Sequence, residues 1–283
     1  MRITASVVLY NTKEEQVKTL LECVKESNCI SKFYVIDNSP KKMSYIASLW
    51  DKIEFIEHEN SGYGSSHNIA IRKSIELHSD YHVVLNPDIE FTSEVLQSLA
   101  SYMDHNNDTV YMLPKVIYPD GRLQYLCKLL PTPNDLIFRR FFPQVKWLER
   151  QNNKYSLKHS GYDRIMNPPC LSGCFMFLRV KTLEENDLFF DERYFMYLED
   201  FDLMRRLHKV GKTLYYPYVT IIHNHAKESY KNKRMLKIHI QSAIKYFNKF
   251  GWFFDKERRQ MNKVILKEID DMMIKEVCRA NAL

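Results

Sequence analysis

Glycine is scarce in this chain of 283 residues, which contains only seven, so each one is expected where the backbone needs its conformational freedom. No stretch reaches the roughly 18 consecutive apolar residues that indicate a membrane-spanning helix. The apolar segment Met1–Tyr10 runs directly into Lys13-Glu14-Glu15 without a small-residue cleavage site, so we expect a buried strand there and no export signal. These absences indicate a globular protein that can touch a membrane without crossing it.

The cysteine spacing typical of a zinc site is also missing. Six cysteines stand at positions 23, 29, 127, 170, 174 and 278, and none of them forms a CxxC pair. Reduced thiols in the cytoplasm are therefore expected, and a zinc site is not. Apolar residues make up 45% of the chain and charged residues 27%, a composition that excludes disordered and low-complexity proteins.

The charge is uneven along the chain. A formal charge of +6 is too small to indicate a nucleic-acid-binding protein. Between Lys227 and Val264, however, 11 basic and 3 acidic residues leave a local balance of +8. The segment 245–263 interleaves these cations with aromatic residues, so it could lie in a membrane interface and attract anionic headgroups, or it could pack its aromatic side chains on the rest of the protein. Both alternatives stay open.

The first hundred residues alternate between apolar runs and helical periodicity. Thr12 and Glu15 predict a capping box that opens the first helix, and Asn68–His78 predicts another helix after a loop at Ser61–His67. This alternation is typical of an α/β domain with a parallel sheet. The predicted strands are Ile3–Tyr10, Phe33–Ile36, Ile53–Glu57 and Tyr81–Leu85.

The later part of the chain is less regular. Pro119-Asp120-Gly121 predicts a hairpin turn, and the five prolines of residues 127–169 predict an irregular insertion. A helix is expected to end at Gly211, and another helical region to be interrupted at Gly251. The other predicted elements are a strand at Phe175–Val180, a helix at Asp200–Val210, a strand at Thr213–Ile222 and helical structure from Lys231 onward.

Polar side chains follow three of the predicted strands, where α/β sheets bind their ligands. Asn11 and Asp37 follow the first two; Asp37 with Asn38 could bind a base or sugar hydroxyl, or could only form an Asx turn. Asp88, in Leu85-Asn86-Pro87-Asp88, offers the carboxylate oxygen that Mg²⁺ or Mn²⁺ prefers, although the same residues can start a turn and a helix.

Three further segments could carry chemistry. The glycines of Ser61–Asn68 let a backbone approach a ligand, or form a tight turn; the motif is neither a Walker loop nor a dinucleotide fingerprint. Glu199, Asp200 and Asp202 lie among apolar residues, which favours a general base over simple helix-dipole complementation. His223 and His225, with cations after them, could hold a metal or phosphate, or end an ordinary polar strand.

In this order the motifs resemble the family 2 inverting glycosyltransferases of the GT-A fold, and especially the bacterial rhamnosyltransferase-like members that build surface polysaccharides. The resemblance covers about residues 1–255. Its matching segments are Val7–Asn11, Val35–Ser39, Asn60–Gly64 with Asn68, Leu85–Asp88, Leu171–Met176, Glu199–Leu203 and His223–Ser229.

The resemblance implies an α/β, Rossmann-like nucleotide-diphospho-sugar transferase fold with a mostly parallel central sheet and a C-terminal helical extension. It implies a catalytic domain at 1–230, with a nucleotide-binding half at about 1–110 and an acceptor-binding half at about 111–230. The basic and aromatic extension would be 231–283.

The resemblance also implies residue roles. Asp200 would be the general base, with Glu199 beside it, and Asp88 and His223 would hold Mg²⁺ or Mn²⁺. Asn86 replaces the first acid of the family's Asp-x-Asp motif, which leaves one fewer charged ligand. Acceptor-binding positions would be Ser172, Gly173 and Cys174. Nucleotide-binding positions would be Tyr10, Asn11, Asp37, Asn38, Gly62, Tyr63, Gly64, Asn68, Asn86, Lys227 and Lys231.

The implied reaction moves a sugar, with L-rhamnose from dTDP-L-rhamnose as the best match, to a glycan or lipid-linked acceptor of a surface polysaccharide such as O-antigen or capsule. The protein would be cytoplasmic and peripheral on the inner face of the membrane. The alternatives are a UDP-sugar donor, such as a galactosyl or N-acetylhexosaminyl donor, and a catalytically silent carbohydrate- or membrane-binding module. A sugar nucleotidyltransferase is disfavoured, because Asn11–Glu15 follows the first strand where such enzymes need a glycine-rich loop.

Overall fold

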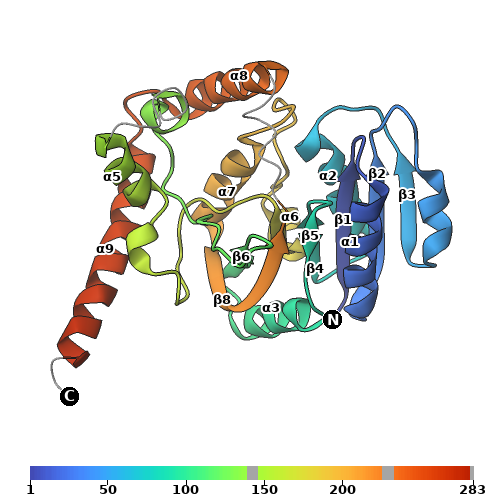
Figure 1. The fold of residues 1–283 in the computed structure, drawn as a ribbon, viewed down its shortest axis with the longest axis horizontal. Coiled ribbons are helices and arrows are strands. Elements are labelled where there is room, and N and C mark those ends of the chain that lie inside the picture. The colour runs from blue at the N-terminus through green and yellow to red at the C-terminus, as the bar shows by residue number, and fades with distance from the viewer. Residues whose placement is uncertain (139–145, 225–232, 281–283) are drawn as a thin grey trace.

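The computed structural model describes residues 1–138, 146–224 and 233–280, and one eight-stranded sheet forms its centre (Figure 1). The strands lie side by side in the order β3-β2-β1-β4-β7-β6-β8-β5. Their bounds are β1 Ile3–Leu9, β2 Ile30–Asp37, β3 Ile53–Glu57, β4 Tyr81–Leu85, β5 Ile89–Glu90, β6 Thr109–Ile117, β7 Phe175–Arg179 and β8 Lys212–His223.

The first half of the sheet is parallel. Strands β3, β2, β1 and β4 all run the same way, and nearly all of β1 is buried, as its continuous apolar run predicts for a strand covered on both faces. The second half is mixed, since β7 is antiparallel to both β4 and β6, β5 is antiparallel to β8, and β6 and β8 are parallel. The predicted α/β class is confirmed.

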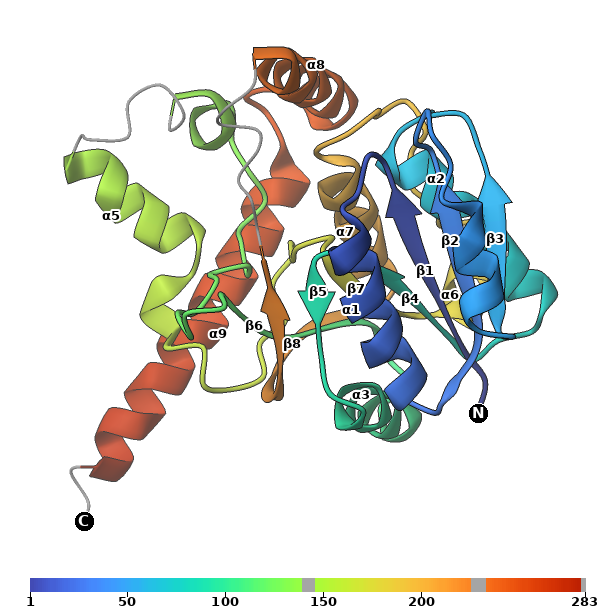
Figure 2. The same cartoon turned by 45° about the vertical axis from the view of Figure 1, so that its right-hand side comes forward.

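Helices cover both faces of this sheet. Helices α1 and α3 lie on one face, and α2, α6 and α7 lie on the other (Figure 2). Two 3-10 turns at Ser44–Leu49 and Lys158–Ser160 and a π turn at Asn134–Phe138 complete the short elements. The helix bounds are α1 Glu14–Glu26, α2 Tyr63–Glu76, α3 Glu94–His105, α5 Lys146–Tyr155, α6 Val180–Glu185, α7 Glu199–Val210, α8 Lys233–Phe250 and α9 Lys256–Ala280.

Two predictions about helix starts are wrong. The capping box does not form, because Lys13 is the N-cap of α1 and the Thr12 hydroxyl instead accepts the N–H of Tyr10 at 3.2 Å. Helix α2 begins at Tyr63, inside the predicted loop, with Gly62 as its N-cap at a φ of 111°. That left-handed backbone is open to glycine at no steric cost.

The middle region is more ordered than its prolines suggest. Residues 127–169 contain α5 and two short helical turns, so the predicted irregular insertion is wrong in part. The predicted hairpin is reduced to a turn with a single bridge between Ile117 and Leu123. On either side of this bridge the N–H of Tyr118 donates to the carbonyl oxygen of Arg122 at 2.8 Å and the N–H of Gln124 to that of Val116 at 2.9 Å, so the hairpin is short. The side-chain amide of Gln124 also donates to the carbonyl oxygen of His223.

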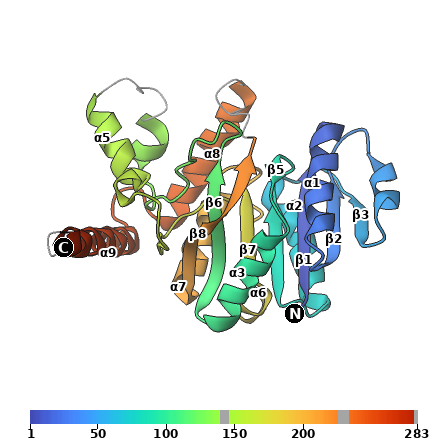
Figure 3. The ribbon, with the colours of Figure 1, turned by 60° about the horizontal axis from the view of Figure 1, so that its bottom comes forward.

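The C-terminal helices α8 and α9 are fastened to the sheet domain. Buried Arg205 of α7 donates to both oxygens of Asp255 at 2.7 and 2.6 Å and to Glu257 at 2.7 Å. Tyr246 and Phe247 of α8 are fully buried in a cluster with residues of the domain. The aromatic segment therefore packs on the domain at this point. Figure 3 looks along α9 and shows α5 and α9 together at one side of the molecule.

The loop between α8 and α9 is different. Phe253 and Phe254 are 69% and 89% exposed, so part of the aromatic segment faces outward. Among the residues that the structure describes, no helix has both the length and the apolar character needed to span a bilayer.

Candidate active site

The carboxyl ends of β1, β2 and β4 come level at one edge of the sheet. Leu9 pairs with Asp37 across β1 and β2, and Val7 pairs with Leu85 across β1 and β4. The segments that begin at Tyr10, Asp37 and Asn86 therefore leave the sheet side by side. This is where α/β sheets bind their ligands.

Asp37 organises the loop that follows β2. Its side chain is fully buried, and its two oxygens accept the backbone N–H groups of Ser39 and Met43, each at 2.8 Å. The Asx turn considered from the sequence thus forms. Next to it the Asn38 amide donates to Ser66 of α2 at 2.6 Å.

An open hollow lies outside this loop. Its walls come from the ends of β1, β2 and β3, and Tyr10 is 46% exposed at its side. Aromatic, amide and hydroxyl groups together suit a nucleoside, which needs one apolar face and several hydrogen bonds. The hollow is lined by Tyr10, Asn38, Ser39, Pro40, Lys42, Glu57, His58, Glu59 and Asn60. Asn11 lies at its edge, where its backbone N–H donates to Ser39 Oγ at 2.9 Å.

The two glycines at the start of α2 lie against other segments of the protein. A Cβ at Gly62 would lie 2.2 Å from the carbonyl oxygen of Phe195, and one at Gly64 would lie 2.7 Å from Cβ of Phe190. Asn68 is fully buried and exchanges two hydrogen bonds of 2.9 Å with the backbone of Phe190. These small and polar residues therefore let α2 dock closely on the segment that leads into α7.

Tyr63 connects two parts of the site. Its buried hydroxyl lies 2.9 Å from Oδ1 of Asn86 and 3.0 Å from the carbonyl oxygen of Gly173, close enough to donate to either. Burial raises its pKa well above the usual range, and the nearby charges of Glu199, Asp200 and Asp88 raise it further. The loop after β4 and the segment before β7 thus meet at one side chain.

Asp88 and His223 form the other half of the site. Pairing of β5 with β8 sets His223 opposite Ile89, and the His223 Nε2 lies 3.5 Å from Asp88 Oδ1. Burial lowers the pKa of His223, but Cys174 and the Asp88 carboxylate outweigh it and raise the pKa to about 10. The imidazole is held by Gln124, whose Oε1 lies 3.0 Å from His223 Nδ1.

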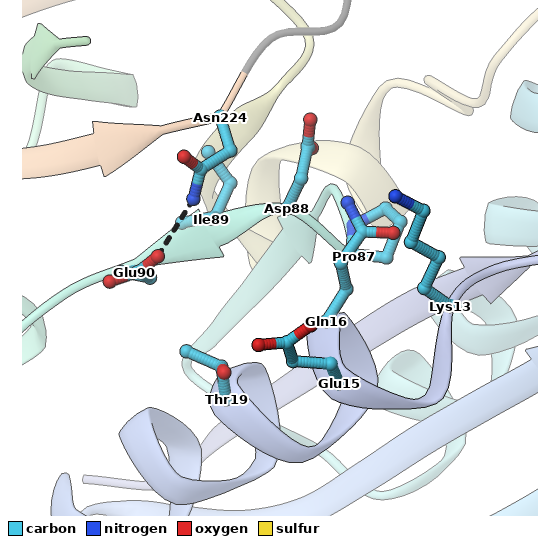
Figure 4. A pocket seen from close by; sticks show the side chains of 9 residues that line it. All are labelled: Lys13, Glu15, Gln16, Thr19, Pro87, Asp88, Ile89, Glu90 and Asn224. Carbon is cyan, nitrogen blue, oxygen red and sulfur yellow. Dashed lines mark hydrogen bonds between the residues drawn. The ribbon is translucent and has the colours of Figure 1, made fainter. Parts of the chain in front are cut away.

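A hollow opens beside Asp88, between the first turns of α1 and the end of β8 (Figure 4). On its floor the amide of Asn224 donates to Glu90 at 2.7 Å. Its lining residues are Lys13, Glu15, Gln16, Thr19, Pro87, Asp88, Ile89, Glu90 and Asn224. The Asp88 side chain is 14% exposed, so a bound molecule can reach it.

Asp88 would offer an oxygen donor to a divalent cation, and His223 would offer its Nε2 once the cation displaces the proton from it. Within residues 1–138, 146–224 and 233–280 no group of three or more His, Cys, Asp or Glu side chains forms a complete metal site. Two protein ligands still fit Mg²⁺ or Mn²⁺, because such ions usually take their remaining ligands from water and substrate phosphates. The residues present therefore fit a cation shared with a diphosphate.

Glu199 and Asp200 begin α7. The N–H of Gly173 donates to Asp200 Oδ2 at 3.1 Å, and the N–H of Phe201 donates to Asp200 Oδ1 at 2.9 Å. Tyr197 and Leu198, just before them, both have a positive φ, of 68° and 66°. Such backbone is costly for residues other than glycine and persists where the surroundings enforce it, as they often do at active sites.

The two carboxyl groups differ in their environment. Burial and the charge of Asp200 raise the pKa of Glu199 well above its usual value, and Glu199 Oε2 has no hydrogen-bond partner among the described residues. Burial also raises the pKa of Asp200, but Lys128 and two backbone N–H groups oppose that rise. Lys128 and the N–H groups of Gly173 and Phe201 therefore favour the charged form of Asp200, whereas the charge of Asp200 disfavours the charged form of Glu199.

The predicted acceptor residues lie between these two halves. The carbonyl oxygen of Ser172 accepts the Tyr111 hydroxyl at 2.8 Å, Gly173 contacts Asp200, and buried Cys174 lies beside His223. The structure thus brings Gly173 against Asp200 and Cys174 beside His223. Lys227 and Lys231 lie outside the described residues.

Two residues of the site could not be identified from the sequence. Gln124 holds His223 at both its ring and its backbone carbonyl, and Lys128 lowers the pKa of Asp200. Gln124 lies beside the predicted hairpin turn, and Lys128 lies in residues 127–169, which show no clear period. No local signal marks either residue, because their partners are distant in the chain.

Comparisons with known proteins show the family to which the chain belongs. The model of the family described as Glycosyl transferase family 2 matches residues 5–187, more than half of the chain. Rhamnosyltransferase WbbL of Escherichia coli (strain K12) is 26% identical over 251 residues, which cover 85% of this chain and 90% of that protein. An N-acetylglucosaminyl-diphospho-decaprenol L-rhamnosyltransferase of Mycobacterium tuberculosis is 26% identical over 183 residues, 59% of this chain and 57% of that protein.

Solved structures show the same fold. The crystal structure of S. aureus TarS 1-349 superposes with a TM-score of 0.59 at 15% identity and covers 94% of this chain and 71% of that one. The structure of GalNAc-T7 with UDP, GalNAc and Mn2+ has a TM-score of 0.59 at 13% identity and covers 86% of this chain and 47% of that one. On these grounds the chain belongs to glycosyl transferase family 2, and it is a rhamnosyltransferase-like glycosyltransferase of the GT-A fold.

Proposed function

We propose that this protein transfers L-rhamnose from dTDP-L-rhamnose, with inversion, to a glycan or lipid-linked acceptor of a bacterial surface polysaccharide. The names of its E. coli and mycobacterial relatives support the sugar. The observation that carries the reaction is the position of the Tyr63 hydroxyl, within hydrogen-bond distance of both Asn86 and Gly173. Asn86 lies two residues before Asp88, and Gly173 contacts Asp200. We infer from this link that a diphosphate near Asp88 and an acceptor near Asp200 belong to one site.

In this proposal Asp200 is the general base. It accepts the proton of the acceptor hydroxyl as the acceptor oxygen bonds to the anomeric carbon of the sugar. The bond from that carbon to the diphosphate oxygen breaks in the same step, and its electron pair leaves with the diphosphate. Attack from the opposite side inverts the configuration. A positioned base of this kind typically contributes about 10²–10⁴-fold in rate.

The other residues bind the donor. The hollow at Tyr10 and Asn38 takes the base and ribose, and Asp37 holds the loop that forms its wall. Asp88 and His223 are the protein ligands of a Mg²⁺ or Mn²⁺ ion, which when bound would offset the negative charge that develops on the leaving diphosphate. Lys227 and Lys231 are proposed as further diphosphate contacts on the basis of the sequence alone.

In this proposal a lipid-linked acceptor comes from the membrane. We place the protein on the cytoplasmic face of the inner membrane, with contact through residues 245–263. Because Tyr246 and Phe247 are buried, this contact would involve Phe253, Phe254 and the cations near them. A lipid-linked acceptor would then reach Asp200 from the bilayer.

A UDP-sugar is the alternative donor. The titles of two similar folds name UDP or UDP-GlcNAc, but an identity of 14–15% speaks for the fold only. A panel of nucleotide sugars separates the donors, because the true donor should raise the melting temperature and be turned over. A catalytically silent module would show neither transfer nor donor hydrolysis, with Mn²⁺ or without it.

The metal role has its own test. Asp88→Ala should weaken nucleotide binding measured by calorimetry with Mn²⁺ present and leave the metal-free titration almost unchanged. Asp120→Ala, on an exposed turn, is the matched control and should match the wild type in both titrations. Equal metal dependence in Asp88→Ala and the wild type would contradict the role of Asp88.

A further inference from the structure

Two adjoining hollows form a continuous groove between α5 and α9, away from Asp88 and Asp200. They share the lining residues Leu129, Thr132, Lys154 and Asn262. We call this the α5–α9 groove. Its remaining lining residues are Leu130, Asp135, Arg150, Gln151, Tyr155, Phe253, Arg258, Arg259, Lys263, Leu266, Lys267, Asp270 and Asp271.

The groove carries an excess of positive charge. Six basic residues line it against three acidic ones, and one of the acids, Asp135, already accepts the backbone N–H and hydroxyl of Thr132. Arg259, Lys263 and Lys267 repeat every four residues along one face of α9. These three, with Lys154 across the groove, make no ion pair to a carboxylate among the described residues. Cations that lack carboxylate partners favour an anionic ligand.

An apolar tip stands at one end of the groove. Phe253 lines it, and Phe253 and Phe254 are the two most exposed aromatic residues of the described chain, at 69% and 89%. Arg259 donates to the carbonyl oxygen of Phe253 at 3.3 Å, so a cation and the aromatic tip are held together. Phenyl rings beside a row of cations match the two layers of a bilayer surface, which are acyl chains and anionic headgroups.

The groove is joined to the catalytic side by one short segment. Asn262 of α9 accepts the N–H of Leu130 at 2.8 Å and donates to its carbonyl oxygen at 3.0 Å. Two residues earlier in the same segment, the ammonium group of Lys128 lies 5.4 Å from the centre of the Phe201 ring, next to Asp200, while Leu129 lines the groove. A surface bound in the groove would therefore lie close to the proposed base.

We propose that the α5–α9 groove, with Phe253 and Phe254 at its rim, binds the phosphate headgroups of an anionic lipid bilayer. The charge complementarity of the groove and the exposed tip carry this inference. It deepens the membrane contact of the proposed function by naming the surface and the headgroup, and it rests on the proposed function for its purpose, which is to present a lipid-linked acceptor to Asp200. Binding itself can be measured without any sugar transfer.

The test uses the full chain in co-flotation with phosphatidylcholine vesicles, with and without phosphatidylglycerol. The wild type should bind only the anionic vesicles, and less as salt is added. The double variant Arg259→Glu, Lys263→Glu should lose about tenfold or more of this binding. The double variant Phe253→Ser, Phe254→Ser should also weaken vesicle binding. Circular dichroism should show that both double variants keep the fold of the wild type.

The matched control is Lys18→Glu with Lys181→Glu, which changes the net charge equally at exposed sites on α1 and α6. It should bind anionic vesicles as the wild type does. Equal loss in this control, binding that ignores phosphatidylglycerol, or a self-association that the groove variants abolish would each overturn the proposal.

Transfer to a soluble acceptor is measured on the same samples. Groove variants should keep this activity. A wild type that transfers sugar but does not bind anionic vesicles would refute the groove and leave the transferase standing. A wild type that binds vesicles but processes no nucleotide sugar would refute the proposed function and leave the groove standing.

Discussion

Gly173 lies directly against Asp200. Its N–H donates to Asp200 Oδ2 at 3.1 Å, and a methyl group at position 173 would stand 2.8 Å from the Asp200 Cβ. A real Cβ contact is almost never that short, so the carboxylate keeps its position only while residue 173 is glycine. The same glycine accepts the Tyr63 hydroxyl at its carbonyl oxygen.

Gly173→Ala should therefore displace Asp200 and lower kcat by about 10- to 100-fold, because a shift of about 1 Å in a reacting group can cost this much. The KM for the donor should change little. The control is Gly211→Ala, where the new methyl would meet Val110 at the far end of α7 and lower the melting temperature without touching the site. Equal kcat loss in both variants would show a general folding defect instead.

Asp200→Asn and Glu199→Gln should behave differently, since Lys128 and backbone N–H groups favour the charged form of Asp200, whereas burial and the charge of Asp200 disfavour that of Glu199. Loss of the proposed base should reduce kcat by about 10²–10⁴-fold while nucleotide affinity stays close to that of the wild type. Glu199 is not the proposed base, so its amide analogue should cost far less. Steady-state kinetics with calorimetry measure both effects. Retained transfer in Asp200→Asn would remove it as the base.

Tyr63→Phe should separate the two halves of the site. The variant loses the hydroxyl that lies between Asn86 and Gly173, so kcat should fall by about tenfold or more, with a loss of about 1–2 kcal/mol in the free energy of unfolding. Tyr162→Phe also removes a buried hydroxyl, one bonded to the backbone of Cys127 and Ser156. It should destabilise the fold similarly without the loss in kcat.

A buried chain of polar groups predicts sensitivity to acid. Thr4 Oγ1 lies 2.9 Å from the His82 Nδ1, and Ser6 lies 2.8 Å from both His82 and His67. Burial lowers the pKa of His82 from 6.5 to about 3, and burial with the neighbouring His82 lowers the pKa of His67 well below 6.5. As the pH falls, these two histidines therefore become protonated in the unfolded chain at a higher pH than in the folded protein.

The stabilisation from these neutral imidazoles should be complete above pH 6.5 and decline as the pH drops toward about 3, by about 1.4 kcal/mol per pH unit for each histidine. Urea unfolding of the wild type and His82→Gln over this range measures it. The difference in stability between the two should shrink with acidification. His105→Gln, at the exposed end of α3, is the control, and a constant difference for His82→Gln would contradict the prediction.

Much of the fold was predictable from local pattern. A strand such as Tyr81–Leu85 is apolar throughout because both faces of the sheet are covered, and the helix at Glu94–His105 repeats its buried residues with helical spacing. The start of α2 was not predictable in this way. Gly62 and Gly64 resemble a loop, but their lack of a side chain serves contacts with Phe195 and Phe190, more than 120 residues later.

What the sequence determined by itself was the set of strand ends, since the end of an apolar run and the polar residue that follows it are local facts. Asp37, Asp88 and His223 could be named from them. The tertiary structure alone decided which of these groups share an environment. The raised pKa of Glu199 beside Asp200, and the meeting of Asn86 with Gly173 at Tyr63, arise from burial and contacts between distant segments, because desolvation and electric fields depend on distance in space and not on order along the chain.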